Sequence, residues 1–235
     1  MGGAFDSGTI FEVTPPRTES VLYNFTGGTD GFHPYGGLIR DSQGNYYGTT
    51  FQGGIAGSGC NFGCGVVFKL AANGTETVLY DFAGGADGSG PIAGLVLDGQ
   101  GNLYGTTVGG GNLTCPGTGC GVVFKIPAAG GETVLYSFLG GSEGARPQSS
   151  LILDGQGNLY GTTYEGGGSN CNGLGCGTVF KISATGEETV LYRFSGGTDG
   201  GTPLAGLVMD SQGNLYGTTG AGGFAGNGVV FKITQ

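Results

Sequence analysis

The chain has 235 residues, among them 58 Gly, 8 Pro, 6 Cys and no Trp, and its formal net charge at pH 7 is −9. So much Gly opposes helices, because Gly costs about 1 kcal/mol per helical position relative to Ala, and an all-β fold is expected. The negative charge argues against a nucleic-acid partner, which needs clustered Lys and Arg. No apolar run approaches the roughly 20 residues of a membrane span, and Met1-Gly2-Gly3 does not open a signal peptide, so we expect a soluble chain without its export signal.

The predicted elements begin with two strand-like runs, Ile10–Val13 and Val21–Phe25. After them a unit of 56 or 57 residues repeats, because the segment GNYYGTT returns three times as GNLYGTT. A period of about 50 residues with several short strands per copy is typical of β-propeller blades. The four segments begin at Gly44, Gly101, Gly157 and Gly213.

Each unit contains four strand-like runs, which we call strands a to d. In the second copy they are Gly94–Leu97, Asn102–Thr107, Val122–Ile126 and Glu132–Phe138. A turn that opens with Asp98 joins strand a to strand b, and a similarly tight turn joins strand c to strand d, so both connections are typical of hairpins. Two hairpins in series predict a four-stranded antiparallel blade.

The two other connections lie at the opposite edge of such a blade. The d-to-a connection spans 12 positions in every copy and reads Gly-Gly-x-acid-Gly-x-x-Pro, whereas the b-to-c connection varies from 9 to 15 positions. A rigid scaffold with variable loops is where binding usually occurs. We therefore place any binding site on this edge.

The strand count predicts how the ring closes. Strand c occurs five times, but strands a, b and d occur four times each. A propeller of about four four-stranded blades closes if Val21–Phe25 completes the C-terminal sheet, which makes residues 1–235 one domain with units at roughly 26–82, 83–138, 139–194, and 195–235 closed by 1–25. The surplus strand c, Ile10–Val13, then has four alternatives: it packs beside its own strand d, competes with its counterpart, marks a piece of a longer array, or pairs with a neighbouring molecule. We expect the last, self-association by strand addition.

The segments GTVFKI, ETVLYRFSGGTDG and GLVMDSQGNLYGTT resemble the Gloeobacter-Verrucomicrobia tandem repeat of bacterial surface and secreted proteins. The G-L-x-x-D-x-x-G-N-L-Y core also resembles the NHL type of propeller blade, with strand a innermost. The resemblance covers nearly the whole chain and implies a bacterial extracellular or cell-surface propeller. It brings no established reaction and no catalytic residues, so none are assigned.

The six cysteines fall in pairs inside three of the b-to-c connections. Local disulfides are the economical interpretation, and they indicate an oxidising compartment. The alternative is a metal site, but the common zinc knuckle is C-x2-C and the chain has a single His. The pairs are Cys60/Cys64, Cys115/Cys120 and Cys171/Cys176.

An acidic residue recurs in each d-to-a connection, before the inner strand. Four acids could ring the mouth of the central channel, where carboxylates would bind Ca2+, the one cofactor considered. The favoured alternative is that each acid only shapes its turn. The residues are Asp30, Asp87, Glu143 and Asp199.

Three function classes follow. The first is a non-enzymatic, extracellular structural or interaction module, and the second is a lectin-like module that binds glycan on the variable-loop face. An extracellular hydrolase or lyase ranks last, because the copies are near-identical and His33 has no relay partner that the sequence identifies. The Lys residues of strand c favour a solvated strand face over a ligand site; they are Lys69, Lys125, Lys181 and Lys232.

Overall fold

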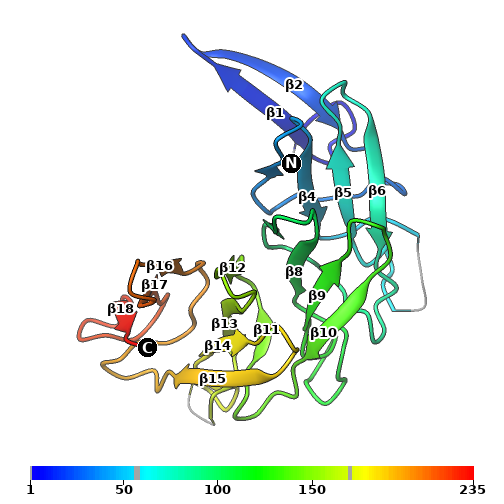
Figure 1. Cartoon of the computed structure of the whole chain (residues 1–235). Coiled ribbons are helices and arrows are strands. Elements are labelled where there is room, and N and C mark those ends of the chain that lie inside the picture. The colour runs from blue at the N-terminus through cyan, green and yellow to red at the C-terminus, as the bar shows by residue number, and fades with distance from the viewer. Residues whose placement is uncertain (1, 56–58, 169–170) are drawn as a thin grey trace.

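The computed structural model describes residues 2–55, 59–168 and 171–235. In this part of the chain the regular elements are β-strands, which confirms the all-β prediction. These residues contain no helix that is long and apolar enough to cross a membrane. The strands form five sheets that follow one another along an open arc (Figure 1).

Three of the sheets contain the predicted antiparallel meander of strands a, b, c and d. In the third of them an additional short strand, β11 (Ala145–Pro147), pairs with the far half of strand b, which was not predicted. The outermost strand of each meander is strand d, seen as β6, β10 and β15 on the outside of the arc in Figure 1. The strands are β3 (Ile39–Arg40), β4 (Tyr46–Thr50), β5 (Val66–Leu70) and β6 (Glu76–Asp81); β7 (Val96–Leu97), β8 (Leu103–Thr107), β9 (Val122–Ile126) and β10 (Thr133–Ser137); and β12 (Ile152–Leu153), β13 (Leu159–Glu165), β14 (Thr178–Ile182) and β15 (Glu188–Arg193).

One aspartate organises each a-to-b hairpin. Asp98 Oδ1 accepts the backbone N–H groups of Gln100 and Asn102 at 2.9 Å each, while Oδ2 accepts the Asn102 side-chain amide at 2.7 Å and the Tyr104 hydroxyl at 2.9 Å. Hydrogen bonds to a carboxylate favour its charged form, and the equivalent bonds, that of Asn45 first, lower the pKa of Asp41 to about 2. The same arrangement recurs at Asp41, Asp154 and Asp210.

The apolar core lies between successive blades. The Phe that directly follows strand d of one blade packs edge to face on the strand c Phe of the next, as Phe82 does on Phe124 with ring centroids 5.1 Å apart. Edge-to-face pairs add about 0.5–1.5 kcal/mol to the burial of the rings themselves. The equivalent pairs are Phe25–Phe68, Phe138–Phe180 and Phe194–Phe231.

The two ends of the arc do not close, which corrects the predicted topology. The strands β1 (Thr9–Thr14) and β2 (Thr18–Asn24) pair with each other in a separate sheet, and the C-terminal sheet has three strands, β16 (Val208–Met209), β17 (Leu215–Thr218) and β18 (Val230–Ile233). The predicted pairing of Val21–Phe25 with the C-terminal sheet is therefore wrong. A hairpin brings together neighbouring segments at a small loop entropy, whereas the predicted pairing joins the two ends of the chain.

Candidate functional site

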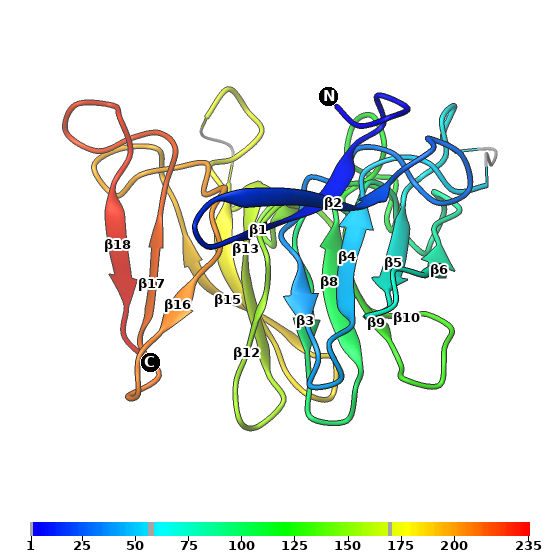
Figure 2. The ribbon, with the colours of Figure 1, turned by 90° about the horizontal axis from the view of Figure 1, so that it is seen from above.

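The two longer connections of each blade share one edge of the arc, which we call the loop face. Figure 2 shows the short a-to-b and c-to-d hairpins at one edge and the long connections at the other. This arrangement follows from the meander, in which tight turns and longer connections alternate between the ends of the strands. The loop face is thus the place where the copies differ most.

The residue before the Pro of each d-to-a connection has the same unusual backbone. His33, Gly90, Arg146 and Thr202 have φ angles of 60°, 65°, 55° and 51°. This left-handed region favours Gly, and a non-Gly residue there costs on the order of 1–3 kcal/mol. Three copies therefore carry a larger side chain at a strained position, and such strain concentrates at functional sites.

The backbone at this position connects neighbouring blades through the disulfide loops. The amide groups of Gly90, Arg146 and Thr202 donate to the carbonyl oxygens of Cys64, Cys120 and Cys176, at 2.8, 2.8 and 2.7 Å. Each acceptor is the second cysteine of the preceding blade. In the first blade, Ser7 takes the cysteine's place and accepts from His33 at 3.1 Å. The loops are thereby held against the next blade.

The structure joins the cysteines within each loop, as Cys60–Cys64, Cys115–Cys120 and Cys171–Cys176, with Cα–Cα distances of 5.3, 5.1 and 5.3 Å. We predict that peptide mapping without reduction recovers these three links in the mature protein. Links between different loops, or free thiols in protein taken from its own oxidising compartment, would contradict this prediction.

The disulfide of the second blade should also stabilise the interface to the third. Replacing Cys115 and Cys120 by Ser should lower the free energy of unfolding by about 2 kcal/mol, because the loop that presents the Cys120 carbonyl loses its cross-link. Chemical denaturation of the oxidised protein measures this. A midpoint unchanged from that of the parent chain would show that the loop is held without the bond.

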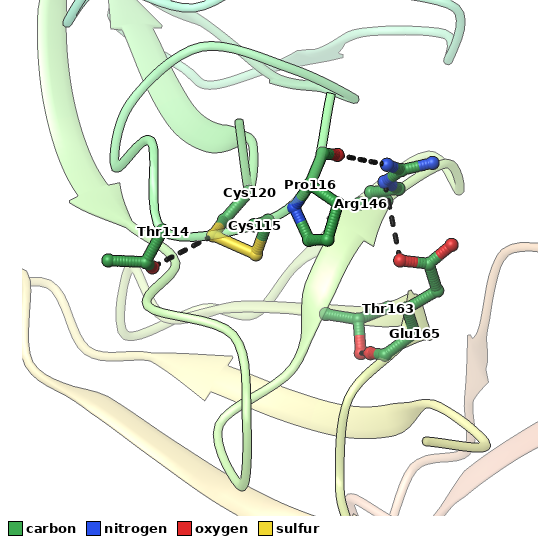
Figure 3. Close-up of polar contacts among 7 residues, drawn as sticks. All are labelled: Thr114, Cys115, Pro116, Cys120, Arg146, Thr163 and Glu165. Carbon is green, nitrogen blue, oxygen red and sulfur yellow. Dashed lines mark hydrogen bonds and ion pairs between the residues drawn. A yellow bond between two sulfur atoms is a disulfide. The ribbon is translucent and has the colours of Figure 1, made fainter. Parts of the chain in front are cut away.

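In the third blade the strained position carries an ion pair (Figure 3). The Nε of Arg146 lies 3.3 Å from Oε2 of Glu165, and the guanidinium donates to the Pro116 carbonyl at 2.7 Å. Glu165 is buried and belongs to β13. The ion pair was not predicted from the sequence. The signal that could have revealed it is that the matching positions of the other copies carry uncharged residues or His in place of this Arg and this Glu.

The first blade carries an aromatic cluster at the same place. Ring centroids lie 3.6 Å apart for Phe32 and His33, 5.5 Å for His33 and Tyr35, and 5.9 Å for Tyr35 and Phe51. Tyr35 is 63 % exposed. Phe51 also lines a cavity of about 280 Å³ with Phe62, which is 70 % exposed, and with the Cys60–Cys64 disulfide. An exposed ring that lines the cavity, Phe62, and a second exposed ring that contacts Phe51, Tyr35, make this part of the loop face a candidate for ligand binding.

The acids of the d-to-a connections bond to groups of their own turns and of the outermost strands. Asp87 accepts the Tyr80 hydroxyl at 3.1 Å and the backbone N–H groups of Ala83 and Gly85 at 2.7 and 3.2 Å. Tyr80 belongs to an outermost strand, and the corresponding tyrosines Tyr23, Tyr136 and Tyr192 likewise donate to Asp30, Glu143 and Asp199. Within the described ranges no three His, Cys, Asp or Glu side chains gather in a group that could hold a metal ion. The binding of Ca2+ by these four acids stays a prediction.

A second set of acids, which the sequence did not predict as site residues, lies at the start of strand d. Glu76, Glu132 and Glu188 each have a buried Oε1 without a hydrogen-bond partner among the described atoms. Burial is the larger cause that raises the pKa of each Glu side chain to about 7. The second cause is the negative charge of the acid in the preceding d-to-a connection, which is Asp30, Asp87 or Glu143. Loss of hydration disfavours the charged form of a carboxyl, and a like charge acts in the same direction.

These three acids predict a stability that falls as the pH rises. Their folded pKa of about 7 lies above the ordinary value of 4.5 for a Glu side chain, so the folded chain binds more protons between these two pH values. The contribution of these three acids to stability should be full below about pH 4.5 and decline through pH 7. We expect a higher melting temperature at pH 5 than at pH 8.

Replacing Glu76, Glu132 and Glu188 together by Gln should flatten this slope. The matched control is Glu187→Gln, which changes the exposed neighbour of Glu188 and should keep the slope. A parent chain that melts at the same temperature at both pH values would refute the assignment.

The sheets lie side by side along an arc, with strand d outermost and a variable loop face at one edge. This arrangement defines an all-β chain of propeller-like blades. No curated protein matches it. The family model described as the Gloeobacter/Verrucomicrobia repeat matches residues 1–174, and the chain belongs to this repeat family.

Solved structures resemble the chain in fold. The extracellular domain of a one-component system from B. thetaiotaomicron has a TM-score of 0.58 at 12 % identity over 97 % of this chain and 25 % of that one. A luciferin-regenerating enzyme has a TM-score of 0.50 at 16 % identity, and the match covers 85 % of this chain and 60 % of the enzyme. A protein described as a gluconolactonase has a TM-score of 0.49 at 14 % identity, and the match covers 94 % of this chain and 65 % of that protein. The chain thus spans less than two thirds of each, and identities this low bear on the fold alone.

Proposed function

We propose that the chain is a non-enzymatic, extracellular bacterial module that binds a partner through its loop face. The observation that carries the proposal is the strained position before Pro: on one repeated backbone it presents His33, Gly90, Arg146 and Thr202 in turn. The repeated polar groups, by contrast, are engaged in their own turns, as Asp98 and Asp87 are. Disulfides in every long b-to-c loop support an oxidising, extracellular location.

Catalysis is tested directly on labelled polysaccharides and chromogenic glycosides. We expect no turnover, because the repeated acids satisfy turns or lie half-buried between blades. Turnover that copurifies with the chain and is lost in the Glu76, Glu132 and Glu188 to Gln variant would overturn the non-enzymatic assignment.

The aromatic cluster of the first blade favours a second candidate function, glycan binding. Exposed Tyr35 and Phe62 offer apolar rings, and Gln52, whose Oε1 lies 3.1 Å from Nδ1 of His33, lines the cavity with Phe62 and Phe51 as a polar neighbour. Apolar ring faces with nearby polar groups are characteristic of ligand pockets.

A glycan array on the intact chain tests this candidate. Replacing Tyr35 and Phe62 by Ala should weaken any glycan binding at least about tenfold, or about 1.4 kcal/mol. Leu113→Ala is the control, because Leu113 is equally exposed but lies in the loop of the second blade. Binding unaffected by the Tyr35 and Phe62 changes, or absent from the array, would leave a protein or another surface polymer as the partner.

A further inference from the structure

The strand β18 ends the C-terminal sheet with an edge that no described strand occupies. In the complete blades the equivalent strand c, such as β9, lies between a strand b and a strand d. β18 pairs with β17 alone, although its Val-Phe-Lys-Ile sequence is that of residues 123–126 in β9. Its free edge therefore presents the N–H and C=O groups that a strand d engages elsewhere, and such an edge invites pairing.

The side chains near this edge are uncovered as well. Val230 is 80 % exposed, whereas Val123, its counterpart in β9, is fully buried. Beside it lies a cavity of about 290 Å³ whose lining includes Phe231, Tyr192 and Asp199. In the second blade the matching Tyr80 and Asp87 interact electrostatically with Glu132, which directly precedes strand d of that blade, β10. The cavity therefore lies where a strand d is missing.

The complete blades show what chemistry fits this place. Their strands d all read Glu-Thr-Val-Leu-Tyr, with the Val half-buried. The strand β2 reads Glu-Ser-Val-Leu-Tyr from Glu19 to Tyr23, but its Val21 is 50 % exposed. The chain thus carries both an unoccupied place for a strand d and a strand d whose apolar side is incompletely covered.

The present partner of β2 is β1, which is a poorer partner than β18. No strand a or b accompanies β1, and its Phe11 is 57 % exposed where the equivalent Phe124 is fully buried. β18 would bring β16 and β17 with it and so restore a whole blade. The charge next to β2 would also change from negative to positive. Ser20 now lies opposite Glu12. In the third blade the equivalent Thr189 lies opposite Lys181, and the same register would place Ser20 opposite Lys232. A strand that carries Glu19 would then gain a cationic neighbour in place of an anionic one.

A second copy reaches this place more easily than the chain's own β2. The ends of the arc lie apart (Figure 1), so closure within one chain would have to bend every interface between blades. Those interfaces are close-packed around buried rings such as Phe82 and Phe124, and packed cores do not deform continuously. Joining two copies keeps the interfaces between the blades of each, although β1 must leave and its Ile10, which is 3 % exposed beside Phe25, gives up that place to the equivalent Val230.

We propose that two copies of this chain associate head to tail, with β18 of one copy displacing β1 of the other and pairing with that copy's β2. The composite blade consists of β16, β17 and β18 from the first copy and β2 from the second. Because the donated and accepting surfaces differ, the contact is heterologous and extends to longer assemblies unless the ring closes. The contact runs along the strand edges and uses none of the residues before Pro on which the proposed function rests, so the inference stands apart from the proposed function.

Cysteine trapping tests the register. With Ser20→Cys and Lys232→Cys in the same chain, we expect disulfide-linked dimers and longer ladders on a non-reducing gel, and each single variant should give no ladder. Glu12→Cys with Ser20→Cys is the control for the hairpin within one chain and should stay monomeric. If the two introduced thiols link only within single chains, one ring closes on itself and the proposal is overturned, as it is by the absence of any link.

Light scattering supplies the second measurement. The weight-average mass should rise with concentration from 23.3 kDa toward at least twice that value. Val230→Lys places a charge at the free edge and should return the chain to monomer, with an unchanged melting temperature as proof of folding. Leu113→Lys, on the loop face, should still associate. A parent chain that stays monomeric at high concentration, or a Val230→Lys variant that assembles normally, refutes the head-to-tail contact.

Discussion

Replacing Phe124 by Ala is expected to lower the free energy of unfolding by about 4 kcal/mol. The ring is fully buried between the second blade and the first, edge to face with Phe82 at 5.1 Å. It also lies over the backbone of Gly105, where even a Cβ atom would come within 2.5 Å of it. Its removal therefore leaves a cavity that neighbouring strands cannot fill without shifting. Denaturant unfolding followed by circular dichroism measures the loss.

The chain contains a matched control for this substitution. Phe11 occupies the same place in strand c of the N-terminal sheet but is 57 % exposed, so Phe11→Ala should cost about 0.5 kcal/mol or less. Similar losses for the two variants would mean that the packing between blades contributes little to stability. A large difference would assign the stability to the interfaces that repeat along the arc.

The repeat predicted the blades because every level of the sequence agrees on them. The hairpin that Asp98 opens, the strand beginning near Asn102 and the tight turn before Glu132 each follow from local chemistry, and each recurs at a fixed spacing. The structure accordingly forms the expected meander in three sheets, with boundaries that differ by one or two residues. Repetition makes a weak local signal reliable.

The same repetition hid how the ends pair. Val21–Phe25 has the strand d sequence that suits either Ile10–Val13 or the C-terminal strand c, so the pattern identifies the kind of partner but not the copy. The choice is made by chain connectivity, which favours the hairpin of β1 with β2. No residue-level signal carries that information.

The candidate site was only partly predictable. Variable connections indicated the loop face, but no motif singled out the first blade's Tyr35 and Phe62, which are exposed. Only one feature of the sequence indicated the strained backbone position before Pro. The second copy has Gly90 there, which has no Cβ atom, whereas the other copies have His, Arg or Thr. The inter-blade position of Glu132 depends on the three-dimensional stacking of the blades, which a single sequence does not show.

Gly121→Ala should be the most damaging change of a single methyl group in the second blade. Gly121 precedes β9 with φ +86°, and an added Cβ atom would lie well under 3.0 Å from the Thr107 carbonyl oxygen, which is backbone and cannot turn away. Its own N–H donates to Gly110 and its C=O accepts from Phe138, so the segment is held on both sides. Left-handed strain and overpacking each cost about 1–3 kcal/mol, and we expect a loss of about 4 kcal/mol.

Gly130→Ala separates these two causes. Gly130 has φ +92° but nothing within 4 Å of the added atom, so this variant should lose only the backbone term, about 1 kcal/mol. Thermal and denaturant unfolding of both variants gives the difference. If Gly121→Ala were no worse than Gly130→Ala, the close approach to Thr107 would not limit the sequence. The glycines at the matching positions Gly65, Gly177 and Gly228, which make the same approach, would then need another explanation.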